Sequence, residues 1–309
     1  MDNKLRKEYV KLHISVVLAA FTGILGKLIN LNAVLLVWYR MFLSFIMFYI
    51  LLLFTKKVPR ENLKECLKIC SLGVLLGLHF LFFFASIKYA NVAVGVVCYS
   101  LEGFFTAIFE PLIFKKPFSR NNLLCSIIAV LGISLIFHID TRYRLGIILG
   151  VISAAMIAFY TIFNKVAGMG KSSKSMLFYE LLGGAAFLTV ILPLYLIFGG
   201  IQFEFPSLSD FTYLFILAFF CTIGLYILHI QVLRTLSAFT VSLYGNFEPV
   251  YGILIAVLFL GEGQELSLSF YIGMCLILIS VFLQSFMHQI YCKTCLLYTS
   301  DAADDRISV

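Results

Sequence analysis

Long uninterrupted apolar runs constrain this chain more than any other feature of its sequence. A window of about 20 predominantly apolar residues is long enough to cross a bilayer as a helix. Hydrophobic residues make up 61% of the 309 residues and charged residues only 13%, which is too little charge to cover the surface of a soluble domain of this size. The pattern predicts an all-α polytopic membrane protein. It excludes a soluble enzyme, a nucleic-acid-binding protein and a secreted disulfide scaffold.

Ten windows of the sequence fit transmembrane helices. They cover residues 10–29, 33–54, 67–87, 91–114, 122–138, 145–164, 176–198, 211–233, 238–260 and 268–288. The connections between them are short, so consecutive helices are expected to run antiparallel and to lie side by side.

The distribution of Lys and Arg predicts how these helices are oriented. Seventeen basic residues fall in the segments on one side of the predicted membrane: Lys4, Arg6, Lys7, Lys11, Lys56, Lys57, Arg60, Lys64, Lys68, Lys115, Lys116, Arg120, Lys165, Lys171, Lys174, Arg234 and Lys293. The other side has four: Lys27, Lys88, Arg142 and Arg144. Because basic residues accumulate in cytoplasmic loops, we expect both termini in the cytoplasm, with the protein in the inner membrane of a bacterium.

The sequence also contains an internal duplication. Residues 93–118 align with residues 238–263 at a constant offset of 145, which pairs Tyr99 with Tyr244. Each half then holds five predicted spans, over residues 10–138 and 145–288. Because five is odd, the second half must enter the membrane from the opposite side, which gives two inverted five-helix repeats. Such repeats recur in secondary transporters, whose site lies near the midplane between the halves.

The ninth predicted span carries a family resemblance. The segment 245–250 (Gly-Asn-Phe-Glu-Pro-Val), running on to Leu-Phe-Leu-Gly-Glu at 258–262, resembles the ninth helix of EamA-type proteins of the drug/metabolite transporter superfamily. The region around Ser280 after Gly273 is similar to the last helix of that family. The resemblance covers about residues 10 to 288. It implies ten helices with both ends inside, and export or exchange of small metabolites such as amino acids without ATP hydrolysis.

Three positions depart from that family pattern. Phe104 stands where Pro249 stands in the second half, so we expect the fourth span to lack a kink. Lys-Lys-Pro at 115–117 replaces the Leu-Gly-Glu that closes the ninth span, and Glu180 occupies a position where the family often has a basic residue. We expect these differences to make the gating motion less symmetric and to leave the fold unchanged.

Two carboxylates near the middle of their spans are the strongest candidates for a functional role. At 1.5 Å per residue, Glu102 lies about 16 Å and Glu248 about 15 Å into a hydrocarbon core about 30 Å thick. A charge at this depth costs about 2.5–3.5 kcal/mol on insertion scales, so each needs a reason to be there. Because the two spans are repeat equivalents, both carboxylates could face one cavity. There they could exchange protons that drive export, or bind a cationic group of the substrate; the alternative is protonated packing residues.

Other side chains at similar depth complete the predicted substrate-binding or coupling site: His79, Tyr99, Tyr226, Tyr244 and Asn246. For His79 and the tyrosines the alternative is hydrogen bonding or packing between helices. Pro249 weakens the helix around it and predicts a break or bend that lines a cavity.

Arg40 and Glu180 are candidate gate residues on opposite sides of the membrane. Their predicted depths differ by about 14 Å at 1.5 Å per residue, so we do not expect them to pair, and snorkelling of each side chain to the nearer interface is the favoured alternative. Tyr160, Asn164 and His229 are expected to line an inner vestibule.

The lead hypothesis is a secondary active transporter, and the sequence contains no pattern that indicates a catalytic residue, a metal site or a cofactor. Expected partners are a small-molecule substrate, the lipid bilayer and, as a coupling ion, protons. The alternatives are an integral membrane enzyme acting on lipid-linked substrates and a non-transporting membrane subunit; substrate and oligomeric state stay open. Residues 295–309 abandon the apolar pattern and resemble translated adapter sequence, which predicts a non-native tail.

Overall fold

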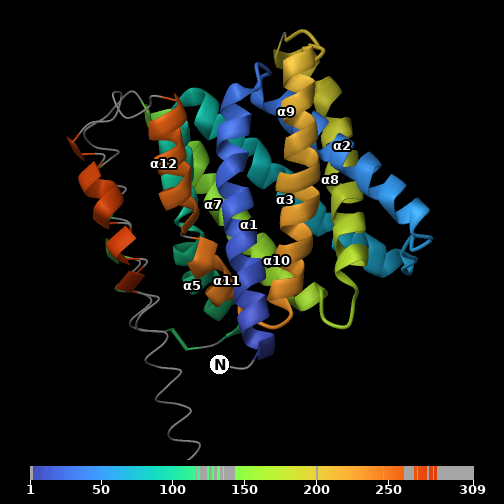
Figure 1. Ribbon diagram of the computed structural model, residues 1–309, viewed down its shortest axis with the longest axis horizontal. Helices are drawn as coiled ribbons and strands as arrows, with labels where there is room; N and C mark the ends of the chain where they lie inside the picture. The colour runs from blue at the N-terminus through green and yellow to red at the C-terminus, as the bar shows by residue number, and fades with distance from the viewer. Residues whose placement is uncertain are drawn as a thin grey trace, which may run out of the picture.

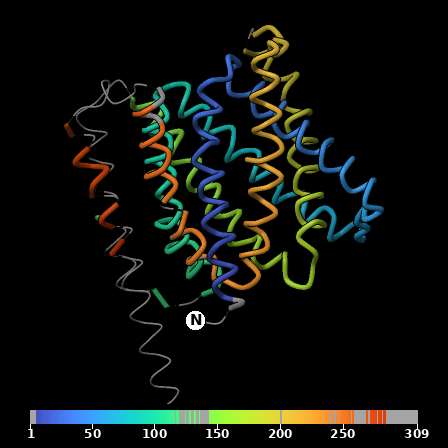
Figure 2. The backbone as a smooth tube through the Cα atoms, in the orientation of Figure 1, coloured from blue at the N-terminus to red at the C-terminus, as the bar shows by residue number. Residues whose placement is uncertain are grey.

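The computed structural model describes residues 3–115, 117–118, 143–199, 201–245 and 247–260, with isolated residues and short stretches between 124 and 135 and between 268 and 283. Within these ranges every regular element is a helix, which confirms the all-α prediction. Figure 1 shows α1 in front, flanked by α11 and α12 on one side and by α9 and α10 on the other. The backbone trace in Figure 2 shows the same order.

Five helices run unbroken for 22 to 27 residues. They are α1 (Asn3–Leu28), α2 (Ala33–Phe54), α3 (Leu63–Tyr89), α7 (Arg144–Ala167) and α8 (Ser173–Gly199). The remaining long elements are interrupted: α4 (Val92–Tyr99) with α5 (Glu102–Phe114), α9 (Leu208–Ala218) with η2 (Phe219–Gly224) and α10 (Leu225–Leu233), and α11 (Ala238–Gly245) with α12 (Phe247–Leu260).

Seven segments of the described chain are long and apolar enough to cross a membrane. They are Leu5–Leu28, Ala33–Phe54, Leu63–Tyr89, Val92–Phe114, Arg144–Ala167, Ser173–Gly199 and Leu208–Leu233. The predicted span 238–260 corresponds to two shorter helices. The predicted span 122–138 lies mostly, and the tail 295–309 wholly, outside the described residues, and the predicted span 268–288 is described only in part, with a short apolar helix at Tyr271–Ser280. The structure therefore supports a polytopic membrane protein, while the number ten stays a prediction.

Asparagine side chains begin three helices of the first half. Asn32, Asn62 and Asn91 each accept a hydrogen bond from a backbone N–H in the first turn of α2, α3 and α4. The first N–H groups of a helix have no partner within it, and a short amide side chain supplies one. These caps explain why the chain turns at short connections.

The fourth and ninth predicted spans break at equivalent positions. α5 begins at Glu102 and α12 at Phe247, which are 145 residues apart, the same offset as the sequence duplication. The prediction that the fourth span lacks a kink because Phe104 replaces a proline is wrong, since α4 ends at Tyr99 without any proline at the break. Pro249 lies in the first turn of α12, where a missing backbone N–H costs no helical hydrogen bond. Each break therefore places a helix N-terminus inside the bundle.

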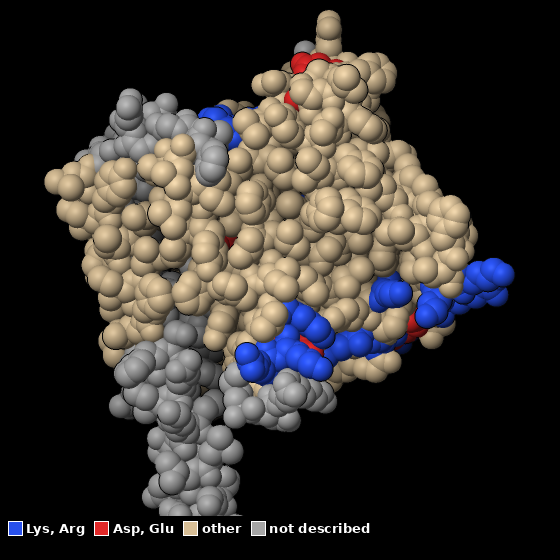
Figure 3. Space-filling view, in the orientation of Figure 1, with Lys and Arg blue, Asp and Glu red and all other residues tan. Residues whose placement is uncertain are grey.

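Lys and Arg lie mainly along one edge of the molecule, and a smaller basic group lies at the opposite edge (Figure 3). On the more basic edge Lys171, in the α7–α8 connection, pairs with Glu65 at 3.1 Å and with Glu61 at 3.4 Å. Hydrogen bonding to Glu65 is the main reason that the pKa of Lys171 is raised. These pairs tie the α2–α3 connection and the first turn of α3 to the α7–α8 connection.

The crossing of α3 over α8 depends on glycine. A Cβ atom added at Gly73 would collide with the main chain of Glu180, and one added at Gly183 would collide with that of Cys70. Small residues let helices approach this closely in membranes, where packing rather than a hydrophobic driving force holds them together. The approach fixes where α8 presents Glu180 to α7.

We expect Gly73→Ala to lower stability by about 1–3 kcal/mol, because the added methyl group overpacks the α3–α8 contact. Gly77→Ala is the matched control on the same helix, since its Cβ would meet Leu188 Cδ1 at an ordinary 3.6 Å. The measurement is the thermal unfolding midpoint of purified protein in detergent. Equal midpoints for the two variants would contradict the close approach.

Candidate functional site

A buried cavity in the middle of the bundle brings together residues from both halves of the chain. It is lined by Leu12, Ser15, Val16, Ala19 and Thr22 of α1, Arg40 of α2, His79, Phe80 and Phe83 of α3, Tyr99 of α4, Glu102 of α5, Ile157 of α7, Leu225, Tyr226 and His229 of α10, Val241 and Gly245 of α11, and Glu248 of α12. Its volume is about 40 Å³, which is room for a few water molecules. The helices therefore leave only a narrow space at the site.

The two helix breaks place both carboxylates in this cavity. Glu102 is the first residue of α5 and Glu248 the second of α12, so each lies in the first turn of its helix, where negative charge is favoured. They are 2% and 4% exposed and close enough to interact electrostatically. One cavity thus holds an acidic group from each half.

The surroundings of the two carboxylates differ. Glu102 Oε1 accepts hydrogen bonds from Thr161 Oγ1 at 2.9 Å and from Ser242 Oγ at 2.8 Å, and the Tyr99 hydroxyl also interacts with it. No hydrogen bond or ion pair joins Glu248 to any residue in the described part of the chain. Glu102 is therefore held in place by the protein, whereas the carboxyl group of Glu248, which also lines the cavity, has no partner among the described residues.

Arg40 provides the positive charge of the cavity. It is fully buried, so the favoured alternative of snorkelling is wrong for this side chain. Its guanidinium lies 3.7 Å from the centre of the Phe80 ring, donates from Nε to Thr222 Oγ1 at 2.7 Å and donates from Nη2 to the Cys221 carbonyl at 2.8 Å. Its Nη1 group is buried and has no partner.

The acceptors for Arg40 come from an irregular stretch of helix. η2 is a π-helical segment within the eighth span, and such segments often occur at functional sites because they disturb the regular hydrogen-bond ladder. Thr222 Oγ1 donates in turn to the Leu217 carbonyl at 3.0 Å. Ser44, one turn after Arg40 on α2, donates to the Ala218 carbonyl at 3.3 Å.

The two histidines of the cavity have different surroundings. His79 Nδ1 lies 2.9 Å from Ser153 Oγ and 3.1 Å from the Ser153 carbonyl, and its ring packs against Phe83 and Tyr99. His79 thus joins α3 to α7 while it lines the cavity. The ring of His229 contacts Tyr226, and its buried Nε2 atom has no partner.

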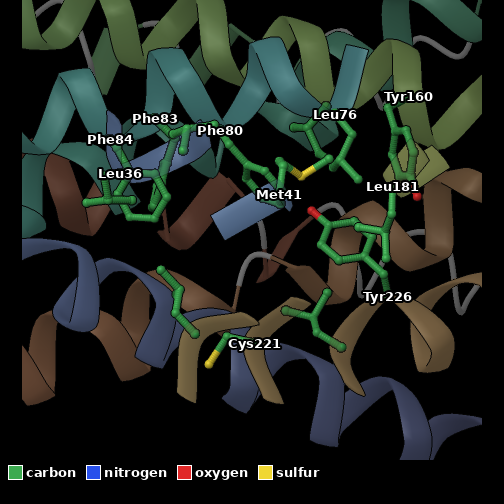
Figure 4. Close-up of a cluster of buried hydrophobic side chains, with 14 of the residues drawn as sticks. Leu36, Met41, Leu76, Phe80, Phe83, Phe84, Tyr160, Leu181, Cys221 and Tyr226 are labelled. Atoms are coloured by element: carbon green, nitrogen blue, oxygen red, sulfur yellow. The ribbon is translucent and has the colours of Figure 1, made fainter. Parts of the chain in front are cut away.

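The predicted vestibule residues divide into two groups. Tyr160 and Asn164 do not line the cavity; they donate to the Glu180 carboxyl at 2.9 and 2.6 Å. Glu180 is fully buried, so snorkelling is wrong for this side chain as well. The Tyr160 ring packs against Tyr226 and His229, and it thereby separates the Glu180 cluster from the cavity. Figure 4 shows Tyr160, Tyr226 and Leu181 at one end of the surrounding apolar cluster, with Phe83 and Phe84 at the other.

Two other predicted residues fall outside the cavity lining. Tyr244, the repeat equivalent of Tyr99, packs against Tyr9 and Phe247. Pro249 is buried in the first turn of α12. Asn246 lies outside the described residues.

Several residues of the site were not predicted from the sequence. The hydroxyls of Thr161, Ser242, Ser153 and Thr222 hold the charged and imidazole groups in place, but isolated Ser and Thr in apolar helices carry no signal of their own. The α1 face could have been found, because its five lining residues, from Leu12 to Thr22, recur at helical spacing with two hydroxyls among them.

We expect Tyr160→Phe to lower stability by about 1–3 kcal/mol, because it removes one of two hydrogen bonds to a fully buried carboxyl group. Tyr244→Phe is the control, since the Tyr244 hydroxyl makes no hydrogen bond to any described residue and its loss should shift the midpoint much less. Thermal unfolding in detergent measures both. A larger shift for Tyr244→Phe would contradict this account of the Glu180 cluster.

Comparisons with known proteins agree with this architecture. A crystal structure of another protein superposes with a TM-score of 0.66 over 91% of this chain and 98% of that chain, at 15% identity, which shows a shared fold. A protein of Haemophilus influenzae (strain ATCC 51907 / DSM 11121 / KW20 / Rd) named as an uncharacterized transporter is 27% identical over 164 residues. That match covers 50% of this chain and 54% of the relative, so the similarity spans about half of each.

The family comparison covers more of the sequence. The pattern of the EamA-like transporter family matches residues 7–138 and again residues 144–286, so it accounts for both halves. The resemblance found in the ninth span is thereby confirmed. The chain belongs to the EamA-like transporter family and is a membrane transporter.

Proposed function

We propose that the protein is a secondary active transporter that exports or exchanges small metabolites such as amino acids by alternating access, and that it has no enzymatic activity. The observation that carries the proposal is the placement of Glu102 and Glu248, one from each half, at helix breaks that face one buried cavity. Discontinuous helices with their ends at a central site are the usual construction of binding sites in secondary transporters.

The size of the cavity supports a mechanism in which the helices separate. About 40 Å³ admits a few waters, and a metabolite needs several times that volume. The α4–α5 and α11–α12 breaks supply points where backbone angles can change more readily than inside a regular helix. α4 packs against α12 and α5 against α11, so movement at either break widens the cavity between the halves.

The unpartnered Glu248 carboxyl is the proposed coupling group. It can bind a cationic group of the substrate, or it can take up a proton in one orientation of the transporter and release it in the other. The groups that face the same cavity, and therefore influence its charge, are Arg40 of α2, His79 of α3, Tyr99 of α4, Glu102 of α5, and Tyr226 and His229 of α10.

The test is counterflow of a labelled amino-acid panel in proteoliposomes with equal protein incorporation. Glu248→Gln and Glu102→Gln are expected to lower uptake by on the order of tenfold or more, because each removes a charge from the site. Glu180→Gln is the matched control for loss of a buried carboxyl outside the cavity, and it should keep at least about half of wild-type uptake. Wild-type rates in both cavity variants would contradict the assigned site, and no uptake of any panel member by wild type would contradict the amino-acid assignment.

A pH gradient separates the two roles of Glu248. If it carries protons, an imposed gradient accelerates wild-type transport and leaves residual transport by Glu248→Gln unchanged. If the gradient changes the transport rate of neither protein, proton coupling is excluded. Direct binding of a cationic substrate group is then the remaining role of Glu248.

We further propose an inner-membrane location with both termini in the cytoplasm, on the basis of the charge asymmetry. In intact cells, a membrane-impermeant maleimide should label Phe205→Cys in the α8–α9 connection and should not label Lys57→Cys in the α2–α3 connection. Wild type, with its native cysteines, gives the background. The opposite labelling pattern would invert the orientation.

A further inference from the structure

The Arg40 guanidinium has a hydrogen-bond donor, Nη1, that has no role in the transport mechanism proposed above. A guanidinium presents five N–H donors in a rigid planar fork. The edge formed by Nε and Nη2 is occupied by the π segment, through Thr222 Oγ1 and the Cys221 carbonyl. Nη1 is buried, lacks any partner in the described part of the chain, and belongs to a side chain that lines the cavity.

A buried charged donor without an acceptor is costly, so this group needs a partner that enters the cavity. Glu248 does not supply it. The two charges are near enough to attract each other, yet no ion pair within 4.0 Å joins Arg40 to an acidic residue among those described. The cavity therefore holds a cation and a carboxyl group that are separated from each other, each with unused hydrogen-bonding capacity.

The walls between these groups are largely aromatic. Phe80, Phe83, Tyr99 and Tyr226 line the same cavity, and the buried, unpartnered Nε2 of His229 adds a second polar contact. A solute that fits must have an anionic group for the guanidinium, a cationic or neutral donor for Glu248, and a compact apolar body between them. A simple amine or quaternary ammonium compound leaves Arg40 unpaired.

We propose that Arg40 is the specificity-determining residue of the cavity: its Nη1 group binds the carboxylate of the transported solute while its other edge remains bound to η2. This inference rests on the proposed transport function and narrows its substrates to compounds that carry a carboxylate. It also gives the π segment a role, because Thr222 and the Cys221 carbonyl hold the guanidinium by its other edge and leave Nη1 without a partner. Thr222 is in this sense a positioning residue.

Two matched sets of labelled solutes test the proposal in proteoliposomes. One set is L-leucine, 3-methylbutan-1-amine and 4-methylpentanoate; the other is L-phenylalanine, 2-phenylethylamine and 3-phenylpropanoate. In each set the second compound lacks the carboxylate and the third lacks the amine. Wild type is expected to have a half-saturation concentration at least about tenfold lower for the amino acid than for the matched amine, as expected for one charge-assisted contact.

Arg40→Gln should reduce that preference to less than about threefold, because uptake of the amino acid falls more than uptake of the amine. Arg40→Lys keeps the charge but loses the planar fork, and it should give an intermediate preference. Thr222→Val should raise the half-saturation concentration for the amino acid more than for the amine, and Thr222→Ser, which keeps the hydroxyl, should restore it. If Arg40→Gln does not fold, the Thr222 pair and Arg40→Lys carry the test.

Other outcomes would overturn the proposal. An unchanged preference in Arg40→Gln, or equal loss of amine and amino-acid uptake, would assign Arg40 a purely structural role. Wild-type uptake of the amines without uptake of any carboxylate-bearing compound would contradict the role of Arg40 and leave transport standing. No uptake of any of the six compounds would contradict both this proposal and the amino-acid assignment.

Discussion

A polar group inside a bilayer has no water to bind, so every such group must find its partner within the protein or in a solute that enters it. Most of the buried polar groups in this chain follow that rule through short contacts between helices. Glu180 is held by Tyr160 and Asn164, and Glu102 by Thr161 and Ser242. Three residues with groups that do not follow it, Glu248, Arg40 and His229, line one cavity. Other buried atoms without a partner among the described residues, such as Ser86 Oγ and Asn91 Nδ2, belong to residues that do not line it.

The helix breaks create this arrangement. A continuous helix would present Glu102 or Glu248 along its side, whereas a helix that begins at or next to the carboxylate places it in the first turn, where the helix dipole favours negative charge. The starts of α5 and α12 keep the 145-residue offset of the sequence duplication. Their causes have diverged, because Pro249 lies next to one break and the other forms without a proline. Equivalent residues in the two halves also differ in role. Tyr99 lines the cavity, whereas its equivalent Tyr244 packs against α1.

The sequence was a good guide to which residues are buried and polar, and a poor guide to what they contact. The depths counted along the helices correctly predicted that Arg40 and Glu180 do not pair, since no ion pair joins them among the described residues. The same counting favoured snorkelling for both, which is wrong. Snorkelling is favourable only where a long side chain lacks a nearer partner. Arg40 has such a nearer partner in the π-helical segment η2. The sequence pattern of residues 208–233 does not predict that irregular turn.

The sequence by itself determined the membrane class, the helical architecture, the family and the presence of acidic groups deep within two related spans. These properties follow from composition, local periodicity and residue order, which a linear chain displays directly. Only the tertiary structure decided that Arg40, Glu102 and Glu248 share a cavity, that Glu180 does not belong to it, and which charged groups remain without a partner. Those properties depend on the rotation and crossing of helices, as at Gly73 against α8, and on hydroxyl groups that become specific only when another helix places a charge beside them.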